Sequence, residues 1–180
     1  MELIDLVDEN NQLIGNKEDK EIAHEKGLWH RECAAWIYQE NGDILIQKRA
    51  ATKKQSPNKW GLCAGHIQAG EEPIKGMLRE IKEELGIEVL EEELEFARVE
   101  EVKQKHPNGS INNTFVYRYF LKTNIPIDKY IIQEEELSEL KYISLEELKQ
   151  IIATKDANYT FSAQESTVWI LKEIQKRIKK

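Results

Sequence analysis

The sequence predicts an α/β fold in which helices lie against a mixed β-sheet. Apolar runs with the length of strands are joined by polar turns at several places along the chain. Segments with helical periodicity stand between these runs and after them. Helices interleaved with strands that are mostly linked by hairpins are typical of α/β layers on a mixed sheet. The chain of 180 residues and 21.0 kDa has the size of one domain, and we expect residues 1–180 to form a single domain.

The N-terminal elements are predicted to be short. Leu3–Val7 and Leu13–Gly15 flank a polar turn, which indicates two strands. The charged segment Lys17–Lys26 predicts a short helix, and Gly27 follows it as a stop signal. The apolar run Cys33–Tyr38 then predicts a strand of a longer sheet.

A hairpin is the strongest local signal in the chain. The runs Cys33–Tyr38 and Ile44–Gln47 are separated by a polar segment with an Asn-Gly pair, and both residues of such a pair tolerate the positive φ of a tight turn. The next segment, Ala50–Lys59, carries Lys, Ser and Pro and is predicted to be a loop. The remaining elements are expected to be a helix at Ile74–Leu85, strands at Leu94–Lys103 and Thr114–Leu121 around a His-Pro-Asn-Gly-Ser turn, and closing helices at Leu145–Ile152 and Ala163–Ile178.

The composition argues against several classes of protein. The formal net charge is −7 and the pI is near 5.3, which argues against a general nucleic-acid-binding face. No run of about 18 apolar residues predicts a membrane span. The acidic N-terminus does not resemble a secretory signal, and two cysteines, Cys33 and Cys63, are too few for a disulfide framework. We therefore expect a cytoplasmic protein that binds neither nucleic acid nor membranes.

Three carboxylates lie together on the helix predicted at Ile74–Leu85. Glu80, Glu83 and Glu84 stand at i, i+3 and i+4 and share one face, while the apolar positions occupy another face that can enter a core. Like charges at this spacing cost about 0.2–0.5 kcal/mol per pair, so a helix built only for stability would avoid them. The cluster is either a solvated acidic face or a site for Mg²⁺ or Mn²⁺, cations that prefer carboxylate oxygens.

The residues around this cluster have a characteristic spacing. Gly65 is followed after five residues by Glu71, and after seven more by the run Arg79-Glu80-Ile81-Lys82-Glu83-Glu84-Leu85-Gly86-Ile87. This stretch resembles the signature of the Nudix (MutT-like) hydrolases at every fixed position, and the resemblance extends over about Leu28 to Ile152. It implies a Nudix-type α/β/α sandwich with a mixed β-sheet. The core then covers about residues 28–152, and the N-terminal strands and the last helix are additions to it.

The resemblance implies an enzyme that uses Mg²⁺ or Mn²⁺ to hydrolyse a diphosphate linkage in a small-molecule substrate. By this resemblance, Glu83 and Glu84 are metal ligands. Glu80 is either a ligand or the base that activates water, and the choice stays open. Arg79 is expected to pair with a carboxylate of the same stretch, Glu71, and so to hold the loop on the helix.

Other candidate site residues lie outside the helix. The resemblance implies that the backbone carbonyl of Ala64 contacts a metal, and that Glu136, before a last strand, is a further metal ligand or else a solvated loop charge. Lys48 and Arg49 end a predicted strand and are either phosphate ligands or an ordinary surface pair. Trp60 is expected to be a packing residue rather than a base-stacking one.

A second resemblance is to isopentenyl-diphosphate isomerase, a branch of the same family. His24, His30 and His66 stand where the isomerase holds a metal through histidines. The catalytic Cys of the isomerase corresponds to Ala64, whereas Cys63 stands one residue earlier and points to the other face of a strand. A later strand also lacks the two carboxylates that the isomerase needs. The histidines are therefore either a second metal site or structural residues held by hydrogen bonds.

The sequence favours a Mg²⁺-dependent hydrolase of a nucleoside diphosphate derivative or a related organic diphosphate. The alternatives are isopentenyl-diphosphate isomerase and a non-catalytic Nudix-fold module that senses a nucleotide. Marks of the known substrate subgroups are missing, so the identity of the substrate stays open. A homodimer is also left open.

Overall fold

The structure is a computed structural model that describes residues 2–106, 109–161 and 166–178. The chain forms two compact units, each built from segments that are separated in the sequence. The first unit comprises Met1–Ala35, Ala64–Ile81 and Glu88–Tyr119, and the second comprises Trp36–Cys63, Lys82–Ile87 and Phe120–Lys180. Among the described elements, one helix, Pro73–Leu85, and three strands, His30–Tyr38, Cys63–His66 and Ile111–Lys122, contain residues of both units.

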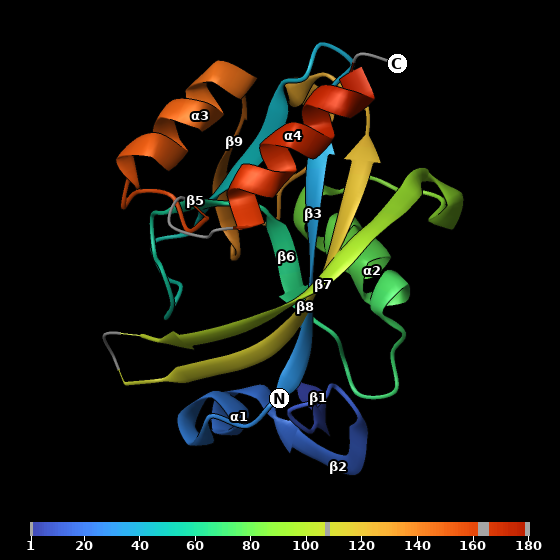
Figure 1. Ribbon diagram of the computed structural model, residues 1–180, viewed down its shortest axis with the longest axis vertical. Helices are drawn as coiled ribbons and strands as arrows, with labels where there is room; N and C mark the ends of the chain where they lie inside the picture. The colour runs from blue at the N-terminus through green and yellow to red at the C-terminus, as the bar shows by residue number, and fades with distance from the viewer. Residues whose placement is uncertain (1, 107–108, 162–165, 179–180) are drawn as a thin grey trace. The chain divides into compact units, whose positions relative to one another are not determined.

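The first unit begins with a small antiparallel sheet and a short helix, drawn in blue in Figure 1. Strand β1 (Leu3–Val7) pairs with β2 (Leu13–Asp19), and helix α1 (Lys20–Lys26) follows at once. The carboxylate of Asp19 caps the helix by accepting a hydrogen bond from a backbone amide of the first turn at 2.9 Å. Gly27 ends the helix in the left-handed conformation, with φ of 63°.

Helix α1 is shorter than the charged segment Lys17–Lys26 predicts. Residues 17–19 belong to β2, because they pair with residues 3–5 of β1. The prediction was wrong at these three positions, since their charged composition indicates a helix while pairing with a second strand decides the outcome. The stop at Gly27 was predicted correctly.

Strands of a larger, seven-stranded sheet run through the first unit. In this unit β3 (His30–Tyr38), β8 (Ile111–Lys122) and β7 (Leu94–Lys105) are hydrogen-bonded in the order β3-β8-β7, and β6 (Cys63–His66) pairs with β3. The three longer strands confirm the predicted ones and extend beyond them by a few residues. Residues 107–108, in the predicted turn between β7 and β8, lie outside the described residues.

In the second unit the sheet continues in the order β5-β4-β3. Strand β4 (Ile44–Arg49) pairs with β5 (Trp60–Gly61) and with β9 (Leu137–Ile143), both antiparallel. The predicted hairpin between β3 and β4 is present, and Gly42 adopts φ of 92° in its turn. Strands β5 and β6 were not predicted, because two and four residues are too few to show an alternating pattern.

Three longer helices complete the fold. They are α2 (Pro73–Leu85), α3 (Leu145–Thr154) and α4 (Ser166–Ile178), and α3 and α4 lie side by side in the second unit (Figure 1). Residues 163–165, at the start of the predicted last helix, lie outside the described residues. No described helix is both long enough and apolar enough to cross a membrane. Two short 3₁₀ helices are Glu91–Glu93 and Ile127–Lys129.

Helix α2 buries the apolar face that its sequence predicts. Met77, Ile81 and Leu85 are completely buried. Each such side chain contributes about 1.5–3 kcal/mol when it leaves water, so the three together fix the rotation of the helix about its axis. That rotation determines the direction in which the carboxylates on the other face point.

Candidate functional site

Glu80, Glu83 and Glu84, here called the glutamate face, lie on the one helix α2. Glu83 is exposed, but Glu80 is only 8% exposed and Glu84 only 4%. A carboxylate is rarely buried to this extent unless hydrogen bonds or cations compensate for its lost hydration. The glutamate face is therefore not simply a solvated acidic surface, and the partners of its two buried members need to be identified.

Glu80 lies against a glycine of β6. A Cβ atom added at Gly65 would lie 2.1 Å from the Glu80 carboxyl carbon, so an ordinary side chain at Gly65 would displace the carboxylate. The thiol of Cys33 on β3 also reaches this place and donates a hydrogen bond to the Gly65 carbonyl at 3.6 Å. Burial, and after it the negative charge of Glu80, raises the pKa of the Cys33 thiol well above its ordinary value. The thiol therefore stays protonated and uncharged beside Glu80.

Arg79 joins the loop before α2 to the helix. Its Nε and Nη2 donate to the two oxygens of Glu71, each at 3.0 Å, and its Nη1 donates to Glu80 Oε1 at 2.6 Å. Nη2 also donates to the backbone carbonyl of His66 at 2.8 Å. Burial favours the neutral form of the guanidinium, but Glu71 and Glu80 outweigh it and raise the pKa of Arg79 above its ordinary value. Arg79 thus stays charged and fixes the orientation of both carboxylates.

Glu84 has its own partner in the second unit. The side-chain amide of Gln47, in the middle of β4, donates from Nε2 to Glu84 Oε2 at 2.8 Å. Gln47 is 1% exposed, and its Oε1 has no hydrogen-bond partner among the described residues. A buried polar atom left in this state indicates a missing partner such as an ion or a water molecule.

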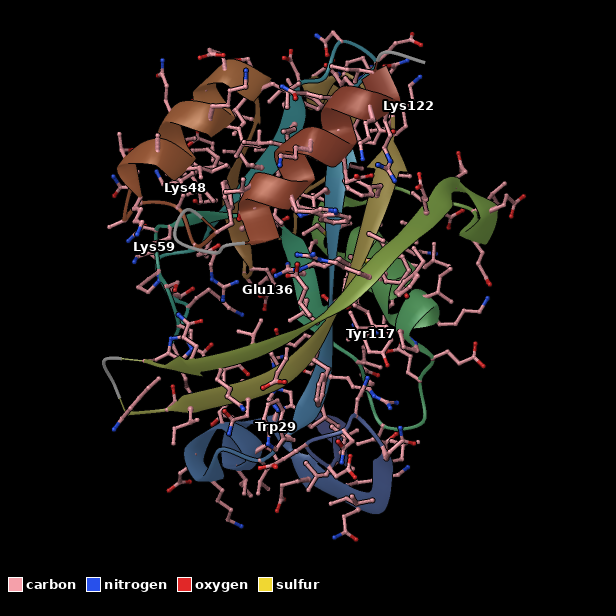
Figure 2. All side chains as sticks on the ribbon, in the orientation of Figure 1. Trp29, Lys48, Lys59, Tyr117, Lys122 and Glu136 are labelled. Carbon is pink, nitrogen blue, oxygen red and sulfur yellow. The ribbon has the colours of Figure 1, made fainter. Side chains whose placement is uncertain are left out.

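Lys48 and Arg49 of β4 and Glu136 before β9 also lie in the second unit. The side chains of Lys48 and Glu136 are labelled in Figure 2. The Lys53 ammonium forms an ion pair with the Glu136 carboxylate. Lys48 Nζ lies 3.7 Å from Glu139, and Arg49 Nε donates to a loop carbonyl at 3.1 Å. Lys48 and Arg49 are both half-buried, so parts of both side chains remain accessible to solvent.

Trp60 and Ala64 occupy the two short strands. The Trp60 ring, on β5, is half-buried and has two ammonium groups over it, Lys141 Nζ at 4.6 Å and Lys48 Nζ at 5.7 Å from the ring centroid. Ala64 lies on β6 directly before the Gly65 that faces Glu80.

Three histidines and one carboxylate of the first unit form a second group, here called the histidine cluster. It comprises His24 at the end of α1, His30 and Glu32 on β3, and His66 on β6, and one donor atom from each lies within 4.8 Å of the others. His24 Nε2 and His66 Nε2 are 3.1 Å apart, and Glu32 Oε1 lies 3.5 Å from His66 Nε2. His30 Nε2 is buried and has no hydrogen-bond partner among the described residues. The sequence analysis brought the three histidines together but missed Glu32.

The charges within the histidine cluster are uneven. Burial opposes ionisation of Glu32, but His30, whose Nε2 lies 3.7 Å from Glu32 Oε1, and the proximity of His66 lower the pKa of the carboxyl to about 2. Burial lowers the pKa of His66 to about 4 and also lowers the pKa of His24. At neutral pH these two imidazoles are therefore neutral, which is the form that binds metals.

Comparisons with known proteins show the family of the chain. A family model described as the NUDIX domain matches residues 28–164. The chain belongs to the Nudix hydrolase family. This Nudix hydrolase is 35% identical over 159 residues to an uncharacterized Nudix hydrolase of Clostridium acetobutylicum, an alignment that covers 86% of this chain and 75% of the relative. It is also 30% identical over 172 residues to isopentenyl-diphosphate Delta-isomerase 2 of Photorhabdus laumondii, with 88% and 86% of the two chains covered.

Solved structures support the same fold. The crystal structure of DR0079 from Deinococcus radiodurans matches this Nudix hydrolase with a TM-score of 0.66 at 22% identity, and the match covers 97% of this chain and 98% of the other. The predicted fold class, a Nudix-type α/β/α sandwich with a mixed sheet, is confirmed. The family also confirms an enzyme whose general chemistry is the hydrolysis of diphosphate linkages.

Sequence reasoning missed three residues of these sites. Glu32 follows His30 at i+2 on β3, and this alternation could have placed both side chains on one face of a strand. Gln47 directly follows the apolar run of β4, and this position could have marked it as a candidate site residue. Nothing in the sequence around Cys33 indicates a site residue, because a buried free cysteine packs like any small apolar residue of a strand.

Proposed function

We propose that this Nudix hydrolase cleaves a diphosphate linkage in a nucleoside diphosphate derivative or a related organic diphosphate, with Mg²⁺ or Mn²⁺ as its cofactor. The observation that carries the proposal is the burial of Glu80 and Glu84 on the face of α2 that the family signature marks. Holding two carboxylates in a largely dry place is costly for the fold, and a bound divalent cation offsets that cost.

The residues present fit a hard divalent cation. The donors on the glutamate face are all carboxylate oxygens, and the unpartnered Oε1 of Gln47 lies within the same group of side chains as Glu84. Glu80, Glu83 and Glu84 would hold the cation, with the Ala64 carbonyl and Glu136 as further ligands. When bound, the cation neutralises phosphate charge and makes the phosphorus easier to attack.

The chain's own residues then orient the reactants. Arg79 holds Glu80 and Glu71 in fixed positions, which prepares Glu80 to accept a proton from an attacking water molecule or to serve as a ligand. Lys48 and Arg49 are proposed to bind substrate phosphate from the end of β4. Glu136 becomes available as a ligand when its ion pair with Lys53 opens.

The histidine cluster is the observation that favours a second candidate function, isomerisation of isopentenyl diphosphate. The cluster itself fits a transition metal, and we propose that it binds one. Two other features count against the isomerase. Ala64 occupies the position of the catalytic cysteine, and β8 offers Asn112 and Asn113 near its start, where the isomerase needs carboxylates.

A substrate panel tests the proposed function. The protein is incubated with Mg²⁺ and nucleoside diphosphate sugars, dinucleotides, nucleoside triphosphates and prenyl diphosphates, and the products are followed by phosphorus NMR. Cleavage with release of a phosphate-containing product supports the hydrolase. A double-bond shift that leaves the diphosphate intact supports the isomerase, and binding without any reaction supports a nucleotide-sensing module.

The setting of the reaction is proposed from composition. The net charge of −7 disfavours a polyanionic nucleic acid as the partner and favours a small molecule that the local basic residues can hold. Two cysteines, both buried, suit a reducing compartment, and we propose the cytoplasm.

A further inference from the structure

The amide of Gln47 is an unusual feature of strand β4. The residue is 1% exposed and follows the apolar run Ile44–Ile46 of the strand, in which Ile46 is equally buried. A polar side chain buried to this extent needs hydrogen-bond partners for its polar atoms. One half of the amide is explained, because Nε2 donates to Glu84 Oε2 at 2.8 Å. The other half, Oε1, has no partner among the described residues.

The two ends of this amide define its orientation. A carboxylate oxygen accepts hydrogen bonds and cannot donate one while ionised, so the end of Gln47 that faces Glu84 must be the NH₂ group. The oxygen is then the atom left over, buried and able to accept a hydrogen bond. Buried acceptors of this kind are nearly always satisfied in folded proteins, by the chain or by ordered water. A donor that is not part of the described chain is therefore expected beside Glu84.

We propose that Gln47 is a positioning residue for Glu84, and that its Oε1 accepts a hydrogen bond from a water molecule of a hydrated divalent cation held by Glu84. The inference rests on the proposed function, in which Glu84 is a metal ligand. Mg²⁺ and Mn²⁺ keep several water molecules when carboxylates bind them, and these waters are donors only. Gln47 thus meets both requirements of the site, because its Nε2 fixes one carboxylate oxygen and its Oε1 accepts a hydrogen bond from the cation's hydration shell.

Glu84 and its neighbour Glu83 differ in a way that supports this role. Glu83 is exposed and can adopt its binding orientation when a cation arrives. Glu84 is buried at 4% exposure, so it must be oriented before the cation binds. A neutral amide orients the carboxylate without cancelling its charge, which a lysine or arginine at the same position would do.

The test is a titration with Mn²⁺ in the absence of substrate, followed by electron paramagnetic resonance of the free ion. The variants are Gln47→Leu and the nearly isosteric Gln47→Met, with Ile46→Val as a matched control in the same strand. Both Gln47 variants should bind Mn²⁺ about 10- to 100-fold more weakly than the parent, while Ile46→Val binds like the parent. Both variants should still unfold cooperatively, at a lower midpoint than the parent, since the buried Glu84 carboxylate loses its donor.

Two further measurements separate the possible failures. In the hydrolysis assay, the Mg²⁺ concentration for half-maximal rate should rise in the Gln47 variants, while the rate at saturating Mg²⁺ stays within a few-fold of the parent. Parental Mn²⁺ affinity in either folded Gln47 variant overturns the inference and shows the amide to be a structural contact. Parental Mn²⁺ affinity in Glu84→Gln instead overturns the metal assignment of the proposed function itself.

Discussion

The glutamate face and the histidine cluster are two groups of titratable side chains that the chain compensates in different ways. On the glutamate face each buried carboxylate has a donor from outside the group, Arg79 for Glu80 and Gln47 for Glu84. In the histidine cluster the carboxylate of Glu32 lies among imidazoles and also accepts a hydrogen bond from Asn112 Nδ2 at 3.0 Å. The first group therefore gathers three carboxylates, whereas the second holds a single ionised carboxylate among imidazoles, two of which, His24 and His66, are neutral.

The difference shows what each group can bind. Carboxylate oxygens with an excess of negative charge suit Mg²⁺ or Mn²⁺ and the phosphates that such cations attract. Neutral imidazoles with a single carboxylate suit Zn²⁺ and similar transition metals, which need no phosphate to complete the site. Substitutions in each group test whether the two groups differ in this way.

The largest effect is expected from neutralising the glutamate face. Glu83→Gln and Glu84→Gln should each lower turnover by several orders of magnitude, because a lost ligand removes charge stabilisation at the reacting phosphate. The stability of Glu83→Gln should hold or rise slightly, since one like-charge repulsion on an exposed helix position disappears. Steady-state kinetics on the best substrate of the panel and urea unfolding measure the two quantities.

Arg177→Gln is a suitable control for the loss of one charged side chain. Arg177 pairs with Glu173 on α4, away from the family signature, and its replacement should leave turnover unchanged. A near-parental rate in either glutamate variant would show that the residue is only a surface charge and that the assignment of the metal ligands is wrong.

A smaller loss is expected from Gly65→Ala. The added Cβ would lie 2.1 Å from the Glu80 carboxyl carbon, and the flexible end of Glu80 gives way more easily than the backbone. Displacing a reacting group by about 1 Å costs on the order of 100-fold in rate, so activity should fall much more than stability. Comparing the rate and the unfolding midpoint of the variant with those of the parent measures this.

The matched control is Gly70→Ala. Gly70 has φ of 81° and nothing within 4 Å of an added Cβ, so its substitution strains the backbone without touching Glu80. It should cost about 1–2 kcal/mol of stability and little activity. Equal losses of activity in the two variants would mean that the loop as a whole matters, and not the space around Glu80.

The order of elements and the glutamate face were predictable from the sequence because both depend on local patterns. Helical periodicity fixes which residues of α2 share a face, and the Asn-Gly turn fixes the hairpin of β3 and β4. What the sequence could not show is long-range pairing. The contacts of Gln47 with Glu84 and of Glu32 with His66 join segments more than 30 residues apart. Residues 17–19 were predicted to be helical but lie in β2, because they pair with residues 3–5 of another strand.

The histidine cluster should respond to metals independently of the glutamate face. Adding Zn²⁺ to chelator-treated protein should raise the thermal unfolding midpoint, by an amount that corresponds to about 2.7 kcal/mol at a hundredfold excess over the dissociation constant. His66→Asn should abolish this response, and Glu84→Gln should keep it. A Zn²⁺ response that survives in His66→Asn and disappears in Glu84→Gln would place the ion on the glutamate face and remove the contrast.

A pH-dependent loss of stability is expected in the metal-free protein. The pKa of His66 is lowered by burial from 6.5 to about 4, so the unfolded chain binds this proton more readily, and stability falls as the pH drops from 6.5 to about 4. The lowered pKa of Glu32 extends the loss from pH 4.5 to about 2, where its carboxylate becomes protonated in the folded state too. Urea unfolding at a series of pH values measures both steps.

His66→Asn should flatten the upper part of this pH profile. Part of the slope should remain, because burial also lowers the pKa of His24. An identical slope in parent and variant between pH 6.5 and 4 would contradict the assignment of that step to His66.

The smallest effect is expected from Cys63→Ala, and it bears on the branch of the family to which the catalysis belongs. Cys63 is buried at 4% exposure at the start of β6, where a thiol packs as a small hydrophobic group and gains nothing as a nucleophile. Its replacement should cost about 1 kcal/mol of stability and leave diphosphate hydrolysis nearly intact, whereas Glu80→Gln should abolish hydrolysis. Thiol alkylation should likewise inhibit the parent only slowly, because Cys33 and Cys63 are both buried. If Cys63→Ala eliminated the reaction and Glu80→Gln preserved it, the thiol would be the catalytic group and the glutamate face would not be catalytic. This pair of variants therefore compares hydrolase chemistry directly with isomerase chemistry on one fold.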